Sequence, residues 1–298
     1  MVRPAHRDHE LHRGRRRGVR GRHRGGDPRR IGARPRAGSL HRADRRGSVR
    51  IVATGLSHVG RVRTKNDDAF LVGGKVSQTG PVSAEEAHLV AVADGMGGYP
   101  GGDVASRTVL AALAEAFDRI GPDVPALIAA AHARLVEETR ATYPECGTTL
   151  AGVLLVPPGR ALVFHIGDSR VLRASSGYLR SLTVDHTPVG PLVAARTLTP
   201  EEAARVPRAN ALSRSLDAGS PAPEVEILET TYAPGDTYLL ATDGLHGLGR
   251  GLSEEDLEDL LDRPVEDLVA RAVELAVEKD GTDNATLVAL RIMEKGEN

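Results

Sequence analysis

Apolar residues along the chain follow two different periods, and each period predicts a different kind of element. Residues 50–59, 67–73 and 88–93 are short, mostly apolar runs that end at turn residues, so we predict strands there. In residues 103–117 and 124–135, large apolar residues instead recur every three or four positions. That spacing predicts two successive amphipathic helices.

A series of short strands separated by turns follows these helices. We predict strands at 148–156, 161–166, 171–174 and 178–182. Because the turns between them are short, neighbouring strands of this series should pair antiparallel, as a meander. Further strands are predicted at 224–231, 236–242 and 285–292, and further helices at 254–261 and 265–277. Strands and helices in separate runs favour an α+β fold over βαβ winding.

Residues 185–217 differ from the rest because they are loop-like apart from one short helix. Thr199 is a candidate N-cap for that helix, Pro200 suits its first position, and Glu202 completes a capping box. A long, partly ordered insertion in a compact domain often covers a functional site. We therefore predict a flap at 185–217.

Composition narrows the class of protein. The chain has 298 residues, of which 40% are hydrophobic but only 3% are aromatic, so its core must consist mainly of Ala, Val and Leu. The single cysteine, Cys146, excludes a disulfide framework or a thiolate zinc site within one chain and favours a cytoplasmic protein. No apolar run approaches the ~18 residues that a membrane span needs.

Charge is divided unevenly between the N-terminal segment and the rest of the chain. Residues 1–47 hold 16 arginines and four acidic residues, whereas the remainder holds 23 basic and 36 acidic residues. The segment fits a nucleic-acid-binding arm, a disordered extension, or upstream sequence translated ahead of a native start near Val49. We favour the last two, so we predict a disordered Arg-rich extension at 1–47 and a folded domain at 48–298, without a nucleic-acid partner.

Four aspartates stand at junctions between an apolar strand and a turn. They are Asp68, Asp94, Asp243 and Asp283, and each is followed or preceded by a strongly apolar run. Carboxylates brought together at one end of a packed sheet repel one another strongly when water is scarce. Hard divalent cations relieve that repulsion, and oxygen ligands suit Mg²⁺ or Mn²⁺. The pattern therefore predicts a carboxylate metal centre.

Other candidates for chemistry are weaker. Cysteine-dependent phosphatases need an arginine six residues after the nucleophile, and the residue six positions after Cys146 is Gly152, so Cys146 is better explained as a small buried residue. His165 lies in an apolar strand, which is typical of a core histidine. His186 and His246 lie beside polar turns, and the sequence leaves their roles open.

A resemblance to a known family rests on motifs in a fixed order. These motifs are Arg63-x-x-Asn66-Asp67-Asp68, Asp94-Gly95-Met96-Gly97-Gly98, Gly147-Thr148-Thr149, Gly167-Asp168-Ser169-Arg170, Asp185-His186-Thr187, Thr242-Asp243-Gly244 and Asp283-Asn284. Over about residues 50–292 the chain resembles the metal-dependent protein phosphatases of type 2C, especially the bacterial branch. The resemblance implies an α-β-β-α sandwich of two antiparallel sheets flanked by helix pairs. It also implies a serine/threonine protein phosphatase with two core Mn²⁺ or Mg²⁺ ions, acting on phosphorylated proteins. We expect the protein to be a monomer.

The resemblance also implies a role for each matching residue. The implied metal ligands are Asp68, Asp94, Gly95 through its carbonyl, Asp168, Asp243 and Asp283. Asp94 would bridge the two core ions, and Asp168 with Asp243 would hold a third, weaker ion. Arg63 would bind the substrate phosphate, for which a guanidinium is well shaped.

Two departures from the family pattern stand out. Asp67 replaces a glutamate, and Met96 stands where eukaryotic members have a histidine that is a proposed proton donor. The alternative hypothesis is a non-catalytic phosphoprotein-binding module on the same fold. Loss of a metal carboxylate would favour that alternative, and none is lost.

Overall fold

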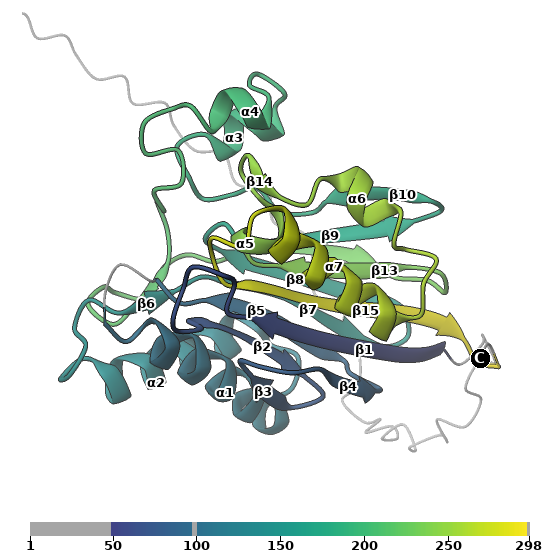
Figure 1. The fold of residues 1–298 in the computed structure, drawn as a ribbon. Coiled ribbons are helices and arrows are strands. Elements are labelled where there is room, and N and C mark those ends of the chain that lie inside the picture. The colour runs from purple at the N-terminus through teal and green to yellow at the C-terminus, as the bar shows by residue number, and fades with distance from the viewer. Residues whose placement is uncertain (1–48, 97–99, 297–298) are drawn as a thin grey trace, which may run out of the picture. The chain divides into compact units, whose positions relative to one another are not determined.

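Two six-stranded antiparallel sheets form the folded unit (Figure 1). The computed structural model describes residues 49–96 and 100–296, so the 1–47 extension and Gly97 and Gly98 of the predicted turn lie outside it. The first sheet has the strand order β10-β9-β13-β15-β1-β4. Its strands are β1 (Val49–His58), β4 (Val82–Glu85), β9 (Arg170–Ser175), β10 (Tyr178–Ser181), β13 (Thr237–Ala241) and β15 (Ala285–Glu294).

The second sheet has the strand order β12-β8-β7-β5-β2-β3. Its strands are β2 (Asp68–Val72), β3 (Lys75–Ser77), β5 (Leu89–Asp94), β7 (Leu150–Val156), β8 (Arg160–Ile166) and β12 (Glu226–Thr231). A small two-stranded sheet pairs β6 (Gly147–Thr148) with β11 (Leu216–Asp217). The α+β class and the antiparallel pairing predicted from the sequence are confirmed.

Helices cover the outer face of each sheet. The long helices α1 (Gly102–Ile120) and α2 (Val124–Thr139) pack on the second sheet, and α7 (Val265–Lys279) packs on the first. The short helices are α3 (Gly190–Ala194), α4 (Pro200–Ala203), α5 (Asp243–His246) and α6 (Glu254–Glu258), and a two-residue strand β14 (Arg250–Gly251) follows α5. No helix among the described residues is both long and apolar enough to cross a membrane.

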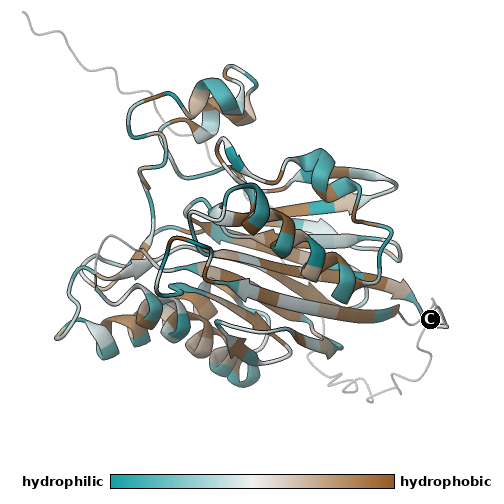
Figure 2. Ribbon diagram, viewed as in Figure 1, coloured by the Kyte–Doolittle hydropathy of each residue, from teal (hydrophilic) through white to brown (hydrophobic). Residues whose placement is uncertain are grey.

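Alternation along the strands divides the core into layers. In β2 and β5, Phe70 and Val92 face the space between the sheets, while Leu71 and Ala91 face α1 and α2. Because helices and the partner sheet cover opposite faces, β2 is buried at every position. Figure 2 shows hydrophobic residues concentrated on the strands, with hydrophilic residues frequent on α6 and α7.

The predicted meander is wrong at one connection. β7 pairs with β8 in the second sheet, but β9 pairs with β10 in the first, so the chain crosses between sheets after β8. Both edges of β8 are already occupied, by β7 on one side and β12 on the other. No edge of β8 is therefore open to β9, and Gly167, with a φ of 103°, turns the chain to the other sheet.

Smaller differences concern element ends and short strands. Helix α6 ends at Glu258 rather than at residue 261, and the edge strands β3 and β4 were not predicted. The capping box predicted at Thr199 is present, and a second one forms at Ser253. Thr199 accepts from the backbone N–H of Glu202, and Ser253 accepts from that of Asp256.

Candidate metal centre

The predicted metal ligands lie where strands of both sheets end on the same side of the sandwich. Asp68 opens β2 and lies directly opposite Asp94, the last residue of β5, in the strand register. In the first sheet, Asp243 opens α5 just after β13, and Asp283 precedes β15. Asp168 lies in the crossing that follows β8. Strands far apart in sequence thus deliver five carboxylates to one place.

A cavity of about 180 Å³ opens among these residues. Six of the predicted site residues line it: Arg63, Asp94, Gly95, Asp168, Asp243 and Asp283. Asp68 lies beneath, fully buried. The structure therefore brings together every predicted site residue, although their roles remain predictions.

Only one of the two carboxylate oxygens of Asp68 accepts hydrogen bonds from hydroxyl groups. Its Oδ2 accepts from Thr242 Oγ1 at 2.7 Å and from Thr286 Oγ1 at 2.6 Å. Its Oδ1 is buried and has no hydrogen-bond partner among the described residues. Burial raises the pKa of Asp68 to about 7, the threonine hydroxyls oppose that rise, and repulsion from Asp243 and Asp283 adds to it.

The neighbouring carboxyls are destabilised in the same way. Burial and then the charges of Asp68 and Asp243 raise the pKa of Asp94 well above its ordinary value. Burial, followed by repulsion from Asp243 and Asp185, raises the pKa of Asp168 to about 8. A buried cluster of mutually repelling carboxylates, with one carboxylate oxygen that has no partner among the described residues, suits a hard cation. The residues present therefore fit Mn²⁺ or Mg²⁺.

Gly95 allows its main chain to pass very close to other backbone segments. Its N–H donates to the carbonyl of Asp67 at 3.1 Å. A Cβ added here would stand 2.2 Å from the carbonyl oxygen of Gly102 and 2.7 Å from that of Asp67. Only glycine fits, which keeps the Gly95 peptide at the cavity wall, where its carbonyl is the predicted ligand.

Two arginines contact the rim of the carboxylate cluster. Arg63, whose side chain is 40% exposed, donates from Nη2 to Asp283 Oδ2 at 3.0 Å. Arg250 was not predicted from the sequence, yet it donates to both Asp243 Oδ2 and Asp283 Oδ2. No motif or apolar period in the sequence marked Arg250 as a site residue.

The two departures from the family pattern lie at this cavity. Asp67 lines it, and the backbone N–H of Asp67 donates to Asn284 Oδ1 at 2.8 Å. Met96 also lines the cavity. Its thioether carries no proton to give, so proton donation must come from another group.

The flap contributes to the same cavity. Asn210 and Leu212, near the end of the predicted 185–217 insertion, line it. The flap packs on itself through a small cluster of Val189, Ala203 and Ala209. The flap at 185–217 stays a prediction, and sequence reasoning did not single out these two cavity residues.

The three histidines considered in the sequence all have hydrogen-bonding or stacking partners. His165 and His186 stack with ring centroids 4.4 Å apart, and both come close to Glu226. His186 Nδ1 accepts the N–H of Gly167, so its proton sits on Nε2, which faces Glu226 at 3.2 Å. A metal ligand needs a free lone pair at that nitrogen, so the tautomer argues against a metal here. His246 is buried, with Nδ1 2.6 Å from the carbonyl oxygen of Leu252.

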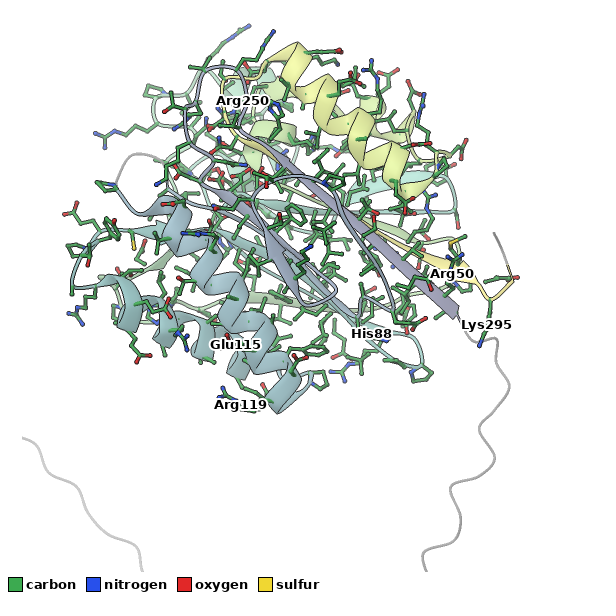
Figure 3. The ribbon with its side chains drawn as sticks, turned by 60° about the horizontal axis from the view of Figure 1, so that its bottom comes forward. Arg50, His88, Glu115, Arg119, Arg250 and Lys295 are labelled. Atoms are coloured by element: carbon green, nitrogen blue, oxygen red, sulfur yellow. The ribbon has the colours of Figure 1, made fainter. Side chains whose placement is uncertain are left out.

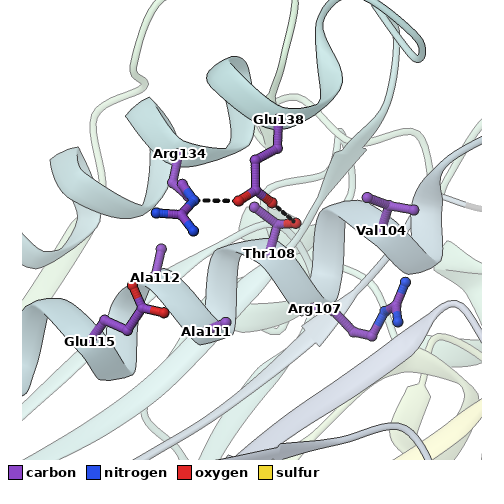
Figure 4. Close-up of a pocket in the computed structure, with 8 residues that line it drawn as sticks. All are labelled: Val104, Arg107, Thr108, Ala111, Ala112, Glu115, Arg134 and Glu138. Atoms are coloured by element: carbon purple, nitrogen blue, oxygen red, sulfur yellow. Dashed lines mark hydrogen bonds and ion pairs between the residues drawn. The ribbon is translucent and has the colours of Figure 1, made fainter.

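Neither Cys146 nor a second cavity among the described residues shows a reactive arrangement of side chains. Cys146 is buried, and burial raises the pKa of its thiol, which disfavours the thiolate. A cavity of about 310 Å³ lies between α1 and α2 (Figure 4). Two of its charged residues pair with each other, because Glu138 accepts from Arg134, and Glu138 also accepts from Thr108. The crowded carboxylates are found only in the smaller of these two cavities.

Comparisons with known proteins agree with this geometry. Serine/threonine protein phosphatase PstP of Mycobacterium tuberculosis is 35% identical over 244 residues, which cover 79% of this chain but only 44% of PstP. Protein phosphatase PhpP of Streptococcus pneumoniae is 31% identical over 254 residues, covering 80% of this chain and 97% of PhpP. The chain thus spans less than half the length of one relative and nearly all of the other.

A solved structure is similar over the same region. It is the catalytic domain of PstP in complex with two manganese ions, which superposes with a TM-score of 0.67 at 32% identity and covers 83% of this chain and all of that one. Two helix-covered antiparallel sheets with a carboxylate-lined cavity at their strand ends define a metal-binding α+β class. The chain belongs to the protein phosphatase 2C family, whose sequence model matches residues 54–288.

Proposed function

We propose that this chain is a metal-dependent serine/threonine protein phosphatase. The observation that carries the proposal is the buried Asp68 Oδ1, which has no partner among the described residues although five further carboxylates line the cavity beside it. The relatives PstP and PhpP are named protein phosphatases, and the PstP catalytic domain binds two manganese ions. All these features support a site that binds metal and hydrolyses phosphate esters.

The residues have distinct roles in this proposal. Asp68, Asp94, Asp243, Asp283 and the Gly95 carbonyl would hold two ions, Asp94 would be a ligand of both, and Asp168 with Asp243 would hold a third. When bound, such ions lower the pKa of water and neutralise phosphoryl oxygens. Arg63 binds the phosphate because its guanidinium lines the cavity and is partly exposed.

The reaction is hydrolysis of a phosphoserine or phosphothreonine ester. An oxygen from water bonds to phosphorus while the bond to the side-chain oxygen breaks, and that oxygen takes a proton. Since Cys146 is buried outside the cavity lining, no phosphorylated cysteine intermediate is invoked. All predicted carboxylates are present, which favours the enzyme over the non-catalytic binding module.

The remaining assignments are proposals of the same kind. Phosphorylated proteins are the proposed substrates, the 48–298 region is the proposed catalytic domain, and the 185–217 flap is proposed to tune access to the cavity. A cytoplasmic protein without a nucleic-acid partner is also proposed, supported by the single cysteine and by the acidic balance beyond residue 47, and a monomer is expected.

Phosphate release from a phosphothreonine peptide tests the proposal. Purified protein should release phosphate in the presence of Mn²⁺ or Mg²⁺, and EDTA should stop the release. The Asp94→Asn substitution should remove most turnover, because two ions would lose their shared ligand. Asp262→Asn, at an exposed aspartate outside the cavity lining, is the matched control and should keep full activity. Undiminished hydrolysis in metal-free buffer would contradict the proposal.

A further inference from the structure

Arg250 makes an unusual pair of contacts with the proposed metal ligands. Its Nη2 donates to Asp243 Oδ2, and its Nη1 lies 3.4 Å from Asp283 Oδ2. Burial alone would lower the pKa of this guanidinium, but the charges of Asp243 and Asp283 raise it. The side chain is only 25% exposed, and its Nε is buried with no partner among the described residues. Figure 3 shows Arg250 at the end of the sheets opposite to Arg50.

The backbone is built to present this side chain. After α5 the chain folds back on itself, with bridges between His246 and Gly251 and between Gly247 and Arg250. A Cβ on Gly247 would stand 2.1 Å from the carbonyl oxygen of Asp243, and one on Gly251, whose φ is 72°, would stand 2.3 Å from that of Leu245. Glycines on both sides therefore let the hairpin close tightly and bring Arg250 against the carboxylates.

Arg250 and a divalent ion need the same oxygen atoms. Mg²⁺, for example, binds carboxylate oxygen at about 2.0–2.1 Å, well inside hydrogen-bond distance. A guanidinium held on Asp243 Oδ2 and Asp283 Oδ2 would then lie within a few ångströms of a second cation, and the two would repel each other. Asp283 cannot easily offer its other oxygen to the ion, because its Oδ1 already accepts a hydrogen bond from the N–H of Asn284 at 2.9 Å.

We propose that Arg250 is an internal counter-cation of the centre: it holds Asp243 and Asp283 together, must be displaced before an ion binds there, and so lowers the metal affinity of the site. The inference rests on the proposed metal centre. Arg250 differs here from Arg63, which contacts Asp283 alone and is more exposed, so that its contact costs less to break. Arg250 thus acts through the ligands and is a positioning residue.

If Arg250 instead oriented the ligands in favour of metal binding, its removal would change the metal affinity in the opposite direction. Side chains that orient metal ligands from outside typically strengthen binding, and their loss weakens metal affinity by about 10–100-fold. If Arg250 were such a residue, its removal would raise the dissociation constant for the metal. The sign of the change in metal affinity therefore decides between the two roles.

Titration of the full chain with Mn²⁺ by isothermal calorimetry, after removal of metal with EDTA, gives that sign. Arg250→Ala should lower the dissociation constant about tenfold, which is the worth of one charge-assisted hydrogen bond. The dissociation constant of Arg250→Lys should lie between those of wild type and Arg250→Ala, because the single ammonium group of lysine cannot contact both carboxylates. Arg271→Ala removes the same charge from the exposed face of α7 and should leave the constant unchanged.

Metal-free stability gives a second readout. Arg250→Ala should lower the thermal midpoint in EDTA relative to wild type, since Asp243 and Asp283 lose a counter-charge, and added Mn²⁺ should raise the midpoint of this variant more than that of wild type. Arg250→Gln removes the charge while keeping most of the side-chain volume, and it replaces Arg250→Ala if that variant does not fold without metal. An unchanged or raised dissociation constant in the variant overturns the inference. A wild-type protein that binds no Mn²⁺ overturns the metal centre itself.

Discussion

Replacing Asp68 with asparagine should stabilise the metal-free protein while abolishing its stabilisation by metal. Asp68 is fully buried, and its carboxyl has a pKa of about 7 instead of the ordinary 3.8. A carboxyl with a raised pKa in the folded state keeps its proton longer than in the unfolded state. The free energy of unfolding therefore falls as pH rises from about 4 to about 7, and stays low above that range.

The size of this effect follows from the pKa difference. About three pKa units correspond to about 4 kcal/mol of lost stability at pH 8. The asparagine side chain would keep an oxygen for the hydroxyls of Thr242 and Thr286, but its amide would add two donors in place of the partnerless Oδ1, which offsets part of the gain. We expect Asp68→Asn to be more stable than wild type by about 2 kcal/mol, or about 4–8 °C in thermal midpoint.

Thermal unfolding followed by circular dichroism in EDTA at pH 8 measures this gain, with Asp262→Asn as the control. The gap between Asp68→Asn and wild type should narrow toward pH 5, where the folded wild type is protonated. In Mn²⁺ the order should reverse, because wild type gains binding energy and the variant has lost a ligand. A variant that is less stable than wild type in EDTA at pH 8 would refute the claim that burial makes the ionised Asp68 carboxylate costly in the metal-free protein.

Three further predictions test separate parts of the account. Arg63→Ala should lower kcat/KM for phosphopeptides by roughly 1.5–3 kcal/mol with little change in Mn²⁺ affinity, and unchanged kinetics would mean that the phosphate binds elsewhere. Asp168→Ala should slow turnover while calorimetry still detects two bound Mn²⁺, and loss of both ions would contradict its assignment to a third position. A truncated protein beginning at Ser48 should keep the thermal midpoint and turnover of the full chain, and a marked drop in either would show that residues 1–47 contribute to the domain.

The sequence was sufficient to predict the carboxylates because their signals are local. Asp68 and Asp94 each adjoin an apolar run and a turn, and strand alternation then places them at the same sheet end. Their roles came only from the resemblance to a family. The crossing after β8 could not be predicted, because it depends on β7 and β12 already occupying both edges of that strand.

Arg250 illustrates what pattern reasoning misses at a site. In the sequence it is a charged residue between glycines, which is typical of an exposed turn. Its contacts with Asp243 and Asp283 arise because Gly247 and Gly251 allow a fold-back that no period in the sequence encodes. The hydroxyl partners of Asp68, Thr242 and Thr286, belong to different segments of the chain and likewise meet only when it folds.

The central claim is that aspartates dispersed along the chain form one metal centre between the strand ends. A crystal structure of the Mn²⁺-loaded protein, with anomalous scattering recorded at the manganese edge, tests it most directly. The account predicts two strong peaks in the cavity beside Asp68, Asp94, Asp243 and Asp283, with Asp94 contacting both ions. No peak in that cavity, or a peak only beside His165, His186 and Glu226, would contradict it.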